Sequence, residues 1–518
     1  MLIHLLSKNR YSIFFRSLRD VKANEKRTII LRTHFELDQR LYNTPTSSQI
    51  AGILLEQTSD PPTKGPPIVI YSSSGQSYKI QHYYGCYDPL QYPLLFPYGG
   101  KKHKIKNKKK TVSCIEYYCY KLQIRLAKNS ILLKSGRLLQ QFVVDMYIKI
   151  ETGKLDFYRK EQKKIRADLY QGVVDSVALG ERNASKIGKR IILPAGFIGN
   201  PRDLRKRYLD AMSLGQRYGK PDIFLTITCN PAWSEIVSEL GINEIVQNRP
   251  DLTCRIFRAK LIELKDLIIK KKFFGPVAAF AYVVEFQKRD LSHAHFLIIL
   301  KESSKITFAE SYDEYVAAEI PDAKKHSLLF DLVLKHMMHG PYGEKNPKNV
   351  CMSKKGYCKS RYPKSYCEYT IQAEDSYPIY RRRNNQIQVK VRKSMLDNRW
   401  VVPYNPYLLC RFDCHLNVEV CSSICSVKYL YKYIYKGHDK IAFNLVDTEK
   451  PELFVDEIKQ FQTGRWISPP EAMWRIYAFI LNEMQPSVTT LQVHLPHKHA
   501  ITFQESQDLQ KILSFDFY

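Results

Sequence analysis

The pattern of apolar positions changes its period along the chain and predicts a mixed fold. Between Glu116 and Glu151 apolar side chains recur every three to four residues, which predicts helices. Another helix is predicted from about Arg202 to Tyr218. Pro221 to Pro231 is instead a β-branched and aromatic run bounded by prolines, which is typical of a buried strand.

The segments that follow predict an antiparallel sheet. An amphipathic helix from Leu252 to Lys271 precedes two strand-like runs, Val277 to Gln287 and His293 to Leu300. Only the short turn Lys288 to Ser292 separates these runs, so they should pair as neighbours. The order strand, helix, strand, turn, strand predicts an α+β fold with helices on one face of the sheet.

Composition along the chain suggests where its parts begin and end. Residues 1–80 form an N-terminal extension and linker, with a Pro/Gly/Ser-rich stretch at 59–76. Residues 81–215 are predicted to be mostly helical, and 216–500 to hold the sheet, interrupted by an irregular insertion at about 336–395. Residues 501–518 are expected to be a C-terminal tail.

Charge points to nucleic acid as the partner. The chain has 80 Lys and Arg against 51 Asp and Glu, and its formal charge of +29 attracts phosphate. It contains no apolar run of the roughly 18 residues that a membrane span needs, so we expect no membrane association. No clear secretion signal is present, and twelve scattered cysteines fit a reduced compartment. We expect synthesis in the cytosol and a nuclear location.

A candidate metal site lies at the predicted turn. His293 and His295 alternate on one strand, so both imidazoles face the same way. Glu285 and Gln287 alternate likewise on the preceding strand, and either could be the third ligand. We favour Glu285 because its charge helps to hold a hard cation. Two nitrogens and one oxygen leave places for phosphate oxygen and suit Mg²⁺ or Mn²⁺.

A candidate nucleophile lies in a predicted helix from about Ser422 to Gly437. Tyr429 and Tyr433 are four residues apart and share a helical face, with Lys432 and Lys436 close by. A phenol can attack phosphorus and form a phosphotyrosine, which conserves the energy of the broken bond for rejoining. The lysines and metal-bound phosphate would help the phenol to react at neutral pH. The alternative is that these tyrosines pack in the core.

Two further clusters lie in the predicted insertion. His336, His339, Cys351 and Cys358 have a spacing that suggests a small Zn²⁺ site, the alternative being thiols without a metal. Arg381, Arg382 and Arg383 form a compact candidate for phosphate binding in DNA, the alternative being a solvated charged loop.

Taken together, the motifs resemble the N-terminal, helicase-like region of Helitron transposases, whose nuclease is of the HUH type used in rolling-circle replication. The resemblance rests on seven stretches in order: YDPLQYPLLFPYG (87–99), SGRLLQQFVVDMYIKIE (135–151), GKPDIFLTITCNP (219–231), EFQKRDLSHAH (285–295), LDNRWVVPYNPYLL (396–409), NVEVCSSICSVKYLYKYIYKG (417–437) and PSVTTLQVHLP (486–496).

The resemblance implies roles by position. It implies an HUH-type nuclease core over 216–500, with His293 and His295 on the metal and Tyr429 and Tyr433 as paired nucleophiles. The family usually has Gly-Leu-Pro before the histidines, whereas this chain has Asp-Leu-Ser at 290–292. It often has a cysteine where Tyr342 stands, which weakens the zinc hypothesis. Family members also carry an ATP-driven helicase, yet no G-x-x-x-x-G-K-[ST] phosphate loop occurs here.

The sequence therefore predicts a transposase-type endonuclease that nicks and joins single-stranded DNA through a 5′-phosphotyrosine, working with transposon ends, a target strand and a separate helicase. The alternative is an inactive, transposon-derived remnant that only binds single-stranded DNA. A domesticated chromatin or RNA-binding factor, binding without a divalent metal, is a third reading. The oligomeric state stays open.

Overall fold

The fold was analysed in a computed structural model of the 518-residue chain. The structure describes residues 6–9, 13, 52–53, 68–71, 77–80, 87–98, 112–125, 130–162, 165–183, 193–194, 196–286, 291–340, 351–353, 356–372, 378–391, 394–421, 457–462, 467–489, 491, 500–504 and 506–514. Among these residues no helix is both long enough and apolar enough to cross a bilayer.

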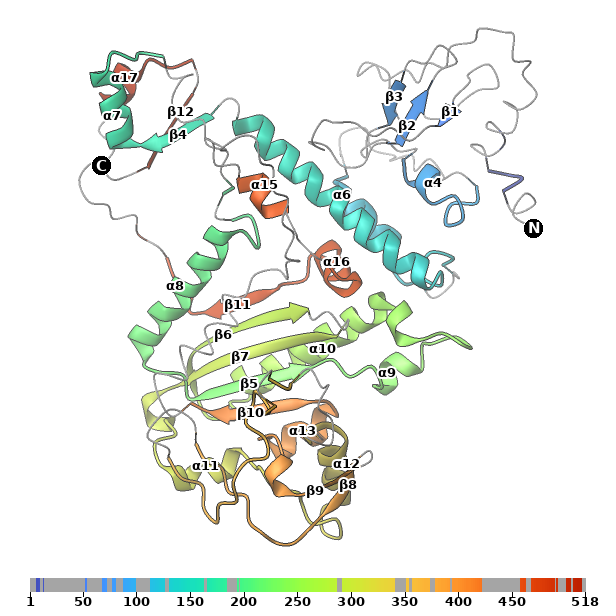
Figure 1. The fold of residues 1–518 in the computed structure, drawn as a ribbon, viewed down its shortest axis with the longest axis vertical. Coiled ribbons are helices and arrows are strands. Elements are labelled where there is room, and N and C mark those ends of the chain that lie inside the picture. The colour runs from blue at the N-terminus through green and yellow to red at the C-terminus, as the bar shows by residue number, and fades with distance from the viewer. Residues whose placement is uncertain are drawn as a thin grey trace.

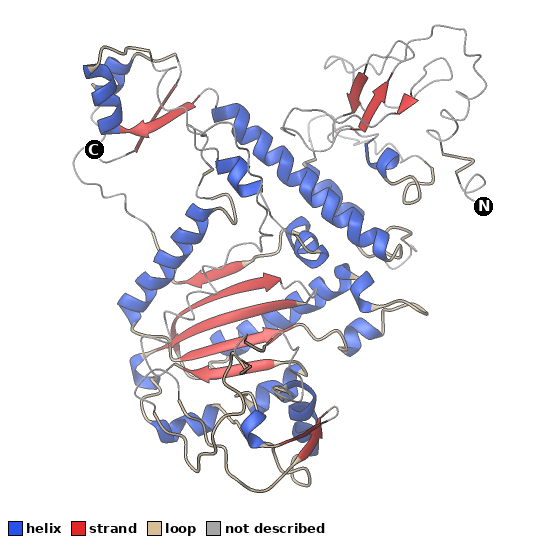
Figure 2. Ribbon diagram, in the orientation of Figure 1, coloured by secondary structure: helices blue, strands red, loops and turns tan. Residues whose placement is uncertain are grey.

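A five-stranded antiparallel sheet lies at the centre (Figures 1 and 2). Its strands follow the order β10-β5-β7-β6-β11. Their bounds are β5 Ile223–Thr228, β6 Val277–Phe286, β7 Ser292–Leu300, β10 Leu416–Val420 and β11 Asn482–Gln485. The three strands predicted from hydrophobic runs are confirmed, and two strands from distant parts of the chain extend the sheet at its edges.

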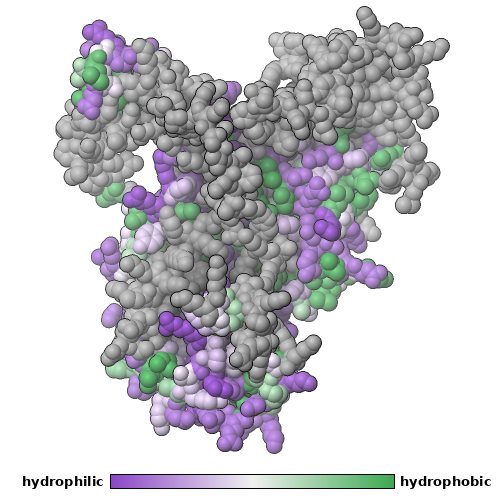
Figure 3. Space-filling view, viewed as in Figure 1, coloured by the Kyte–Doolittle hydropathy of each residue, from purple (hydrophilic) through white to green (hydrophobic). Residues whose placement is uncertain are grey.

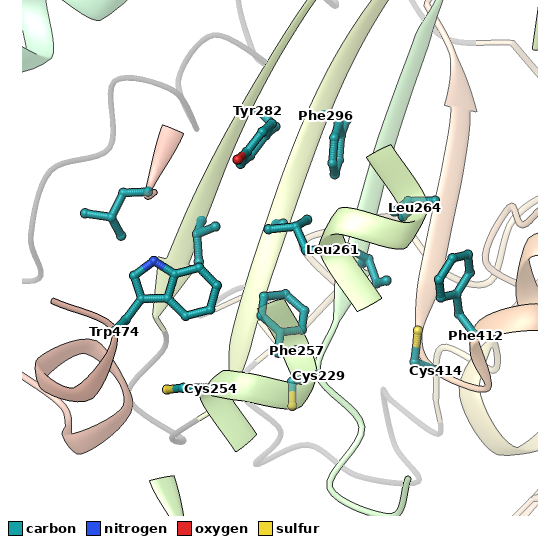
Figure 4. Packing of buried hydrophobic residues seen from close by; sticks show 14 of the residues in the cluster. Cys229, Cys254, Phe257, Leu261, Leu264, Tyr282, Phe296, Phe412, Cys414 and Trp474 are labelled. Atoms are coloured by element: carbon teal, nitrogen blue, oxygen red, sulfur yellow. The ribbon is translucent and has the colours of Figure 1, made fainter. Parts of the chain in front are cut away.

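One face of this sheet is covered by α10 (Pro250–Ile269), the predicted amphipathic helix. Phe257, Leu261 and Leu264 of α10 point into the apolar layer against Phe296 of the sheet (Figure 4). Trp474 of α16 (Pro469–Ile476) closes the same layer and is 1% exposed. Removing one such aromatic side chain should cost about 3–5 kcal/mol of stability.

The opposite face is partly covered by α8 (Pro201–Tyr218). Asn200 caps this helix by accepting from the backbone N–H groups of Arg202 and Asp203. Ala211 of α8 packs with Phe224 and Leu297, which alternate with the core-facing positions of β5 and β7. The expectation of helices on one face is therefore incorrect, because even the outward positions of these strands are apolar away from the histidines.

The predicted helical region is present. It contains α4 (Tyr87–Gln91), α5 (Cys114–Lys121) and α6 (Arg137–Gln162). Ser113 and Glu116 form a capping box at the start of α5. Asp88 joins the helices because it accepts from Lys149 at 2.7 Å and from the hydroxyl of Tyr118 at 2.7 Å. This region packs against α16, so segments far apart in sequence share one core.

The ends of the chain also contain regular elements. Strands β1 (Gly52–Ile53), β2 (Ile68–Tyr71) and β3 (Ser77–Ile80) form a small sheet, and β2 falls inside the predicted linker. Strand β12 (Ala500–Gln504) pairs with β4 (Ile165–Leu169). Helix α17 (Leu509–Leu513), from the predicted tail, packs on α7 (Tyr170–Ala178). The apolar positions Ile501 and Phe503 explain this pairing, since both are buried there.

The segment between β7 and β10 forms an irregular subregion beside the sheet, and its described surface is largely hydrophilic in Figure 3. It contains α11 (Ala309–Tyr315), α12 (Ser327–His336), β8 (Val389–Val391), β9 (Ser394–Leu396) and α13 (Pro406–Phe412). The remaining short elements are α9 Ser234–Val237, α15 Glu457–Gln462 and the 3₁₀ turns Val246–Asn248, Glu302–Ser304 and Asn398–Trp400.

Candidate metal centres

The strand register brings the predicted ligands Glu285, His293 and His295 to one face of the sheet. Glu285 of β6 is paired directly with His293 of β7, and His295 is paired with Thr226 of β5. Side chains of directly paired residues project from the same face of an antiparallel pair. These side chains therefore share the face opposite α10, beyond the end of the apolar patch under α8.

Glu285 and His295 are in direct contact. The Oε2 atom of Glu285 lies 3.3 Å from Nε2 of His295, and both side chains are nearly buried. Neighbouring ligands of an octahedral Mg²⁺, each about 2.1 Å from the ion, lie roughly 3.0 Å apart. The separation in the structure is close to that value, so these two groups can ligate one hard cation after a small adjustment.

Hydrogen bonds and a ring contact orient the imidazoles of His293 and His295. Nδ1 of His293 lies 3.1 Å from the carbonyl oxygen of Leu291, which can only accept, so Nδ1 carries a proton and Nε2 is the nitrogen that can ligate a metal. Nδ1 of His295 lies 2.9 Å from the hydroxyl of Thr226. The ring of His295 also stacks on Phe224, with centroids 5.8 Å apart and planes at 5°. Such contacts orient ligands in metal sites.

His415, which precedes β10, extends the same row of the sheet. Its carbonyl accepts from the N–H of Thr228, the residue paired with His293. Burial, with repulsion from His293 and His336, lowers the pKa of His415 to about 4. His415 is therefore neutral near neutral pH. Neither His415 nor Thr226 was predicted as a site residue, although Thr226 and Thr228 alternate in β5 as the two histidines do in β7.

Several predicted residues lie outside the described part of the chain. These are Gln287, the alternative third ligand, and Tyr429, Lys432, Tyr433 and Lys436 of the predicted nucleophile helix. Their roles stay predictions.

A second cluster combines three of the four residues predicted for zinc. The sulfur of Cys351 lies 3.4 Å from the sulfur of Cys358 and 3.4 Å from Nε2 of His339. The sulfur of Cys358 lies 3.4 Å from the same nitrogen. Among the described residues this is the one group of three or more His, Cys, Asp or Glu with all ligand atoms within 4.8 Å of one another.

His336 does not join this cluster. Its Nε2 lies 2.7 Å from Oδ1 of Asp413. Helix α12 ends at His336, and the chain then becomes extended, with the N–H of His339 donating to the carbonyl of Trp400 at 2.8 Å. A continuing helix would have put both histidines on one face. The four-residue zinc prediction is therefore corrected to three residues in the structure.

Gly340 holds His339 close to the neighbouring backbone. A Cβ atom at this position would lie 2.8 Å from Cε3 of Trp400, which is too short for a van der Waals contact. Only glycine lets the chain lie flat against the indole here. Burial also lowers the pKa of His339 to about 4, with repulsion from His415 and Lys364, so the ring is neutral and able to ligate.

The three arginines predicted to bind phosphate are not three outward side chains. Arg382 is 3% exposed and donates to the carbonyl of Val401. Arg381 forms an ion pair with Asp313 at 2.9 Å, and Arg383 with Glu319 at 2.7 Å. Extended backbone alternates its side chains, which turns the middle arginine inward. The prediction of a three-arginine phosphate site is incorrect for Arg382, and carboxylates already neutralise its neighbours.

Comparison with known families identifies part of the chain. Residues 117–298 match the family model described as Helitron helicase-like domain at N-terminus, so this region is Helitron-related. The matched region includes β5, β6 and most of β7 with the Glu285, His293 and His295 cluster, and it ends before the Cys351 and Cys358 cluster. No curated protein matches the chain significantly.

Proposed function

We propose that this protein is a transposase-type, metal-dependent endonuclease that nicks and joins single-stranded DNA. The observation that carries the proposal is the convergence of Glu285, His293 and His295 on one face of the sheet, with Nε2 of His295 3.3 Å from Glu285. The Helitron-related match over 117–298 covers these residues. The net charge of +29 suits a DNA substrate.

The donor set fits a hard divalent cation. Imidazole nitrogens and a carboxylate oxygen would hold Mg²⁺ or Mn²⁺, and the small number of protein ligands leaves room for a phosphodiester oxygen. When bound, the ion would supply Lewis-acid polarisation of the scissile phosphate. The contacts of Thr226 and Leu291 keep the imidazoles oriented for this role.

The proposed nucleophiles are Tyr429 and Tyr433. The last described residue before them is Cys421, directly after the end of β10 that lies farthest from the histidines. Going back from Cys421 along β10 to the row of His415 and His293 covers six residues, about 20 Å. A helix of the predicted kind advances about 12 Å to Tyr429 and 18 Å to Tyr433. The chain is therefore long enough to bring a phenol to the metal ligands.

In the proposed reaction a tyrosine oxygen attacks the scissile phosphorus and forms a P–O bond. The tyrosine is then joined to the 5′ phosphate of the strand that follows the cut. The bond between phosphorus and the 3′ oxygen breaks, and that oxygen leaves as a 3′-hydroxyl after taking up a proton, while the phenol loses one. Lys432 and Lys436 would assist by stabilising negative charge. A second 3′-hydroxyl can reverse the step on another strand, and two tyrosines permit two successive transfers.

The test uses the full chain, Mn²⁺ and a pool of single-stranded oligonucleotides labelled at the 3′ end. The label reports the fragment that would stay attached to tyrosine, so an active enzyme gives a protein-linked band that survives denaturation. Tyr429→Phe or Tyr433→Phe should remove the band or its transfer products, whereas Tyr431→Phe should retain them. Salt-sensitive binding with no covalent band in any metal would instead support the inactive remnant.

A further inference from the structure

The cluster of His339, Cys351 and Cys358 has the geometry of a metal site. Its three ligand atoms form a triangle with sides of 3.4 Å each. Tetrahedral Zn²⁺ with bonds of about 2.3 Å to sulfur and 2.0 Å to nitrogen places its ligands roughly 3.5–3.8 Å apart. The triangle matches this within a few tenths of an ångström. A disulfide would need the sulfurs at about 2.05 Å, and neither cysteine forms one.

The two cysteines flank a closed turn. The N–H of Ser353 donates to the carbonyl of Tyr357 at 2.8 Å, and Met352 forms a β-bridge with Cys358. The N–H of Lys359 donates to the carbonyl of Cys351 at 2.8 Å, which holds the two cysteine backbones together. These backbone contacts hold Cys351 and Cys358 next to each other.

The third ligand comes from a different element. His339 follows α12 and is held by its backbone bond to Trp400 and by the close approach of Gly340 to the same indole. Its imidazole also contacts the ring of Tyr362, with centroids 4.2 Å apart and planes at 34°. A metal at these three atoms would thus connect the end of α12 to the turn at 351–358.

We propose that Nε2 of His339 and the sulfurs of Cys351 and Cys358 bind one Zn²⁺. Binding releases the thiol proton of each cysteine that was protonated and forms two Zn–S bonds and one Zn–N bond. Soft thiolates select Zn²⁺ over Mg²⁺. The site is separate from the proposed nuclease centre, and its ligands lie outside the Helitron-related match.

The proposed zinc site at residues 339, 351 and 358, called the zinc clasp below, also lies close to the sheet. The N–H of Val402 donates to the carbonyl of Met337, and the N–H of Val418 in β10 donates to the carbonyl of Pro403. The segment at 400–403 therefore connects the backbone next to His339 with the edge strand of the sheet. A metal at His339 would fix the irregular subregion beside this edge.

The experiment is elemental analysis of the purified full chain, expressed with added zinc and dialysed against metal-free buffer. We expect about one zinc per chain, and near-complete loss in Cys351→Ser, Cys358→Ser and His339→Ala. Three matched variants should keep their zinc: Cys410→Ser, which changes an exposed cysteine; His336→Ala, which changes the histidine bound to Asp413; and His293→Ala, which removes the other candidate metal site.

A second measurement covers variants that fail to fold. Wild-type protein reconstituted with Co²⁺ should show thiolate-to-metal charge-transfer absorption, and chelation should make two more cysteines reactive toward a thiol reagent. A chain that retains no zinc and gives no cobalt–thiolate band would overturn the proposal. So would a Cys351–Cys358 disulfide found by mass spectrometry in freshly purified protein, or zinc that is lost with His293→Ala and kept in Cys358→Ser.

Discussion

The two clusters differ in how the chain holds their donors. Glu285, His293 and His295 project from neighbouring strands whose spacing is set by continuous backbone hydrogen bonds. Cys351, Cys358 and His339 come from a turn and an extended segment whose described residues are held by isolated bridges and single hydrogen bonds. The first group is positioned before any metal arrives, whereas the second gains connections from the metal itself.

The donor atoms of the two clusters differ as well, and they suit different metals. Oxygen and nitrogen donors on the sheet suit a hard cation that exchanges water for phosphate, which is a catalytic requirement. Sulfur donors in the turn suit a tightly held Zn²⁺, which is a structural requirement. Two histidine-containing groups in one chain can therefore carry different functions, and the supporting backbone distinguishes them better than the histidines do.

The largest expected effect is on DNA nicking. Glu285→Gln should lower the yield of covalent product about 100-fold or more, because it removes the charged oxygen next to His295. The matched control is Glu483→Gln, which changes a carboxylate on the opposite face of the same sheet, where it pairs with Lys265. Equal activity of the two variants in a single-turnover assay would remove Glu285 from the metal site.

Thr226→Val should have an intermediate effect. It keeps the shape of the side chain but removes the hydroxyl 2.9 Å from Nδ1 of His295. Loss of such a contact typically weakens metal binding about 10–100-fold, so the Mn²⁺ concentration for half-maximal nicking should rise by that factor. The control is Thr228→Val, since the ring of the paired His293 is bonded to Leu291. An unchanged Mn²⁺ requirement in Thr226→Val would contradict the assignment.

A smaller effect on nicking is expected from Cys358→Ser. At saturating Mn²⁺ the rate should fall less than about tenfold, because the clasp acts only through the position of the neighbouring subregion. Limited proteolysis should show faster cleavage near residues 351–360 in this variant than in Cys410→Ser. A loss of nicking as large as that of Glu285→Gln would show that the two clusters are one functional unit.

The smallest effect is expected from His336→Ala. Its bond to Asp413, which is 40% exposed, should contribute only about 1 kcal/mol to the free energy of unfolding. Chemical denaturation should therefore give a slightly lower midpoint, with zinc content unchanged. A large stability loss accompanied by loss of zinc would place His336 among the ligands after all.

Local pattern was sufficient for part of this picture. Alternation in residues 277–300 predicted two paired strands and placed Glu285, His293 and His295 on one side. Periodicity likewise predicted α8 and α10 within a few residues. It could not show that α8 covers the second face or that β10 and β11 complete the sheet, since those pairings join segments that lie far apart in the chain.

The second cluster shows the same limit. Spacing alone made His336 and His339 equivalent, and the end of α12 after His336 separates them. The inward turn of Arg382 depends on packing against the segment around Val401, which the basic run itself does not reveal.

The pairing of Phe286 with Ser292 has a consequence for how this protein can vary. Residues between these strands can change in chemical character, provided that the pairing of the strands is kept. A slip of one residue would instead send both imidazoles into the apolar layer beneath α10 and bring Ala294 to the surface. Substitutions between the two strands should therefore be tolerated, whereas an insertion or deletion of one residue within a strand would reverse the faces of the side chains that follow it.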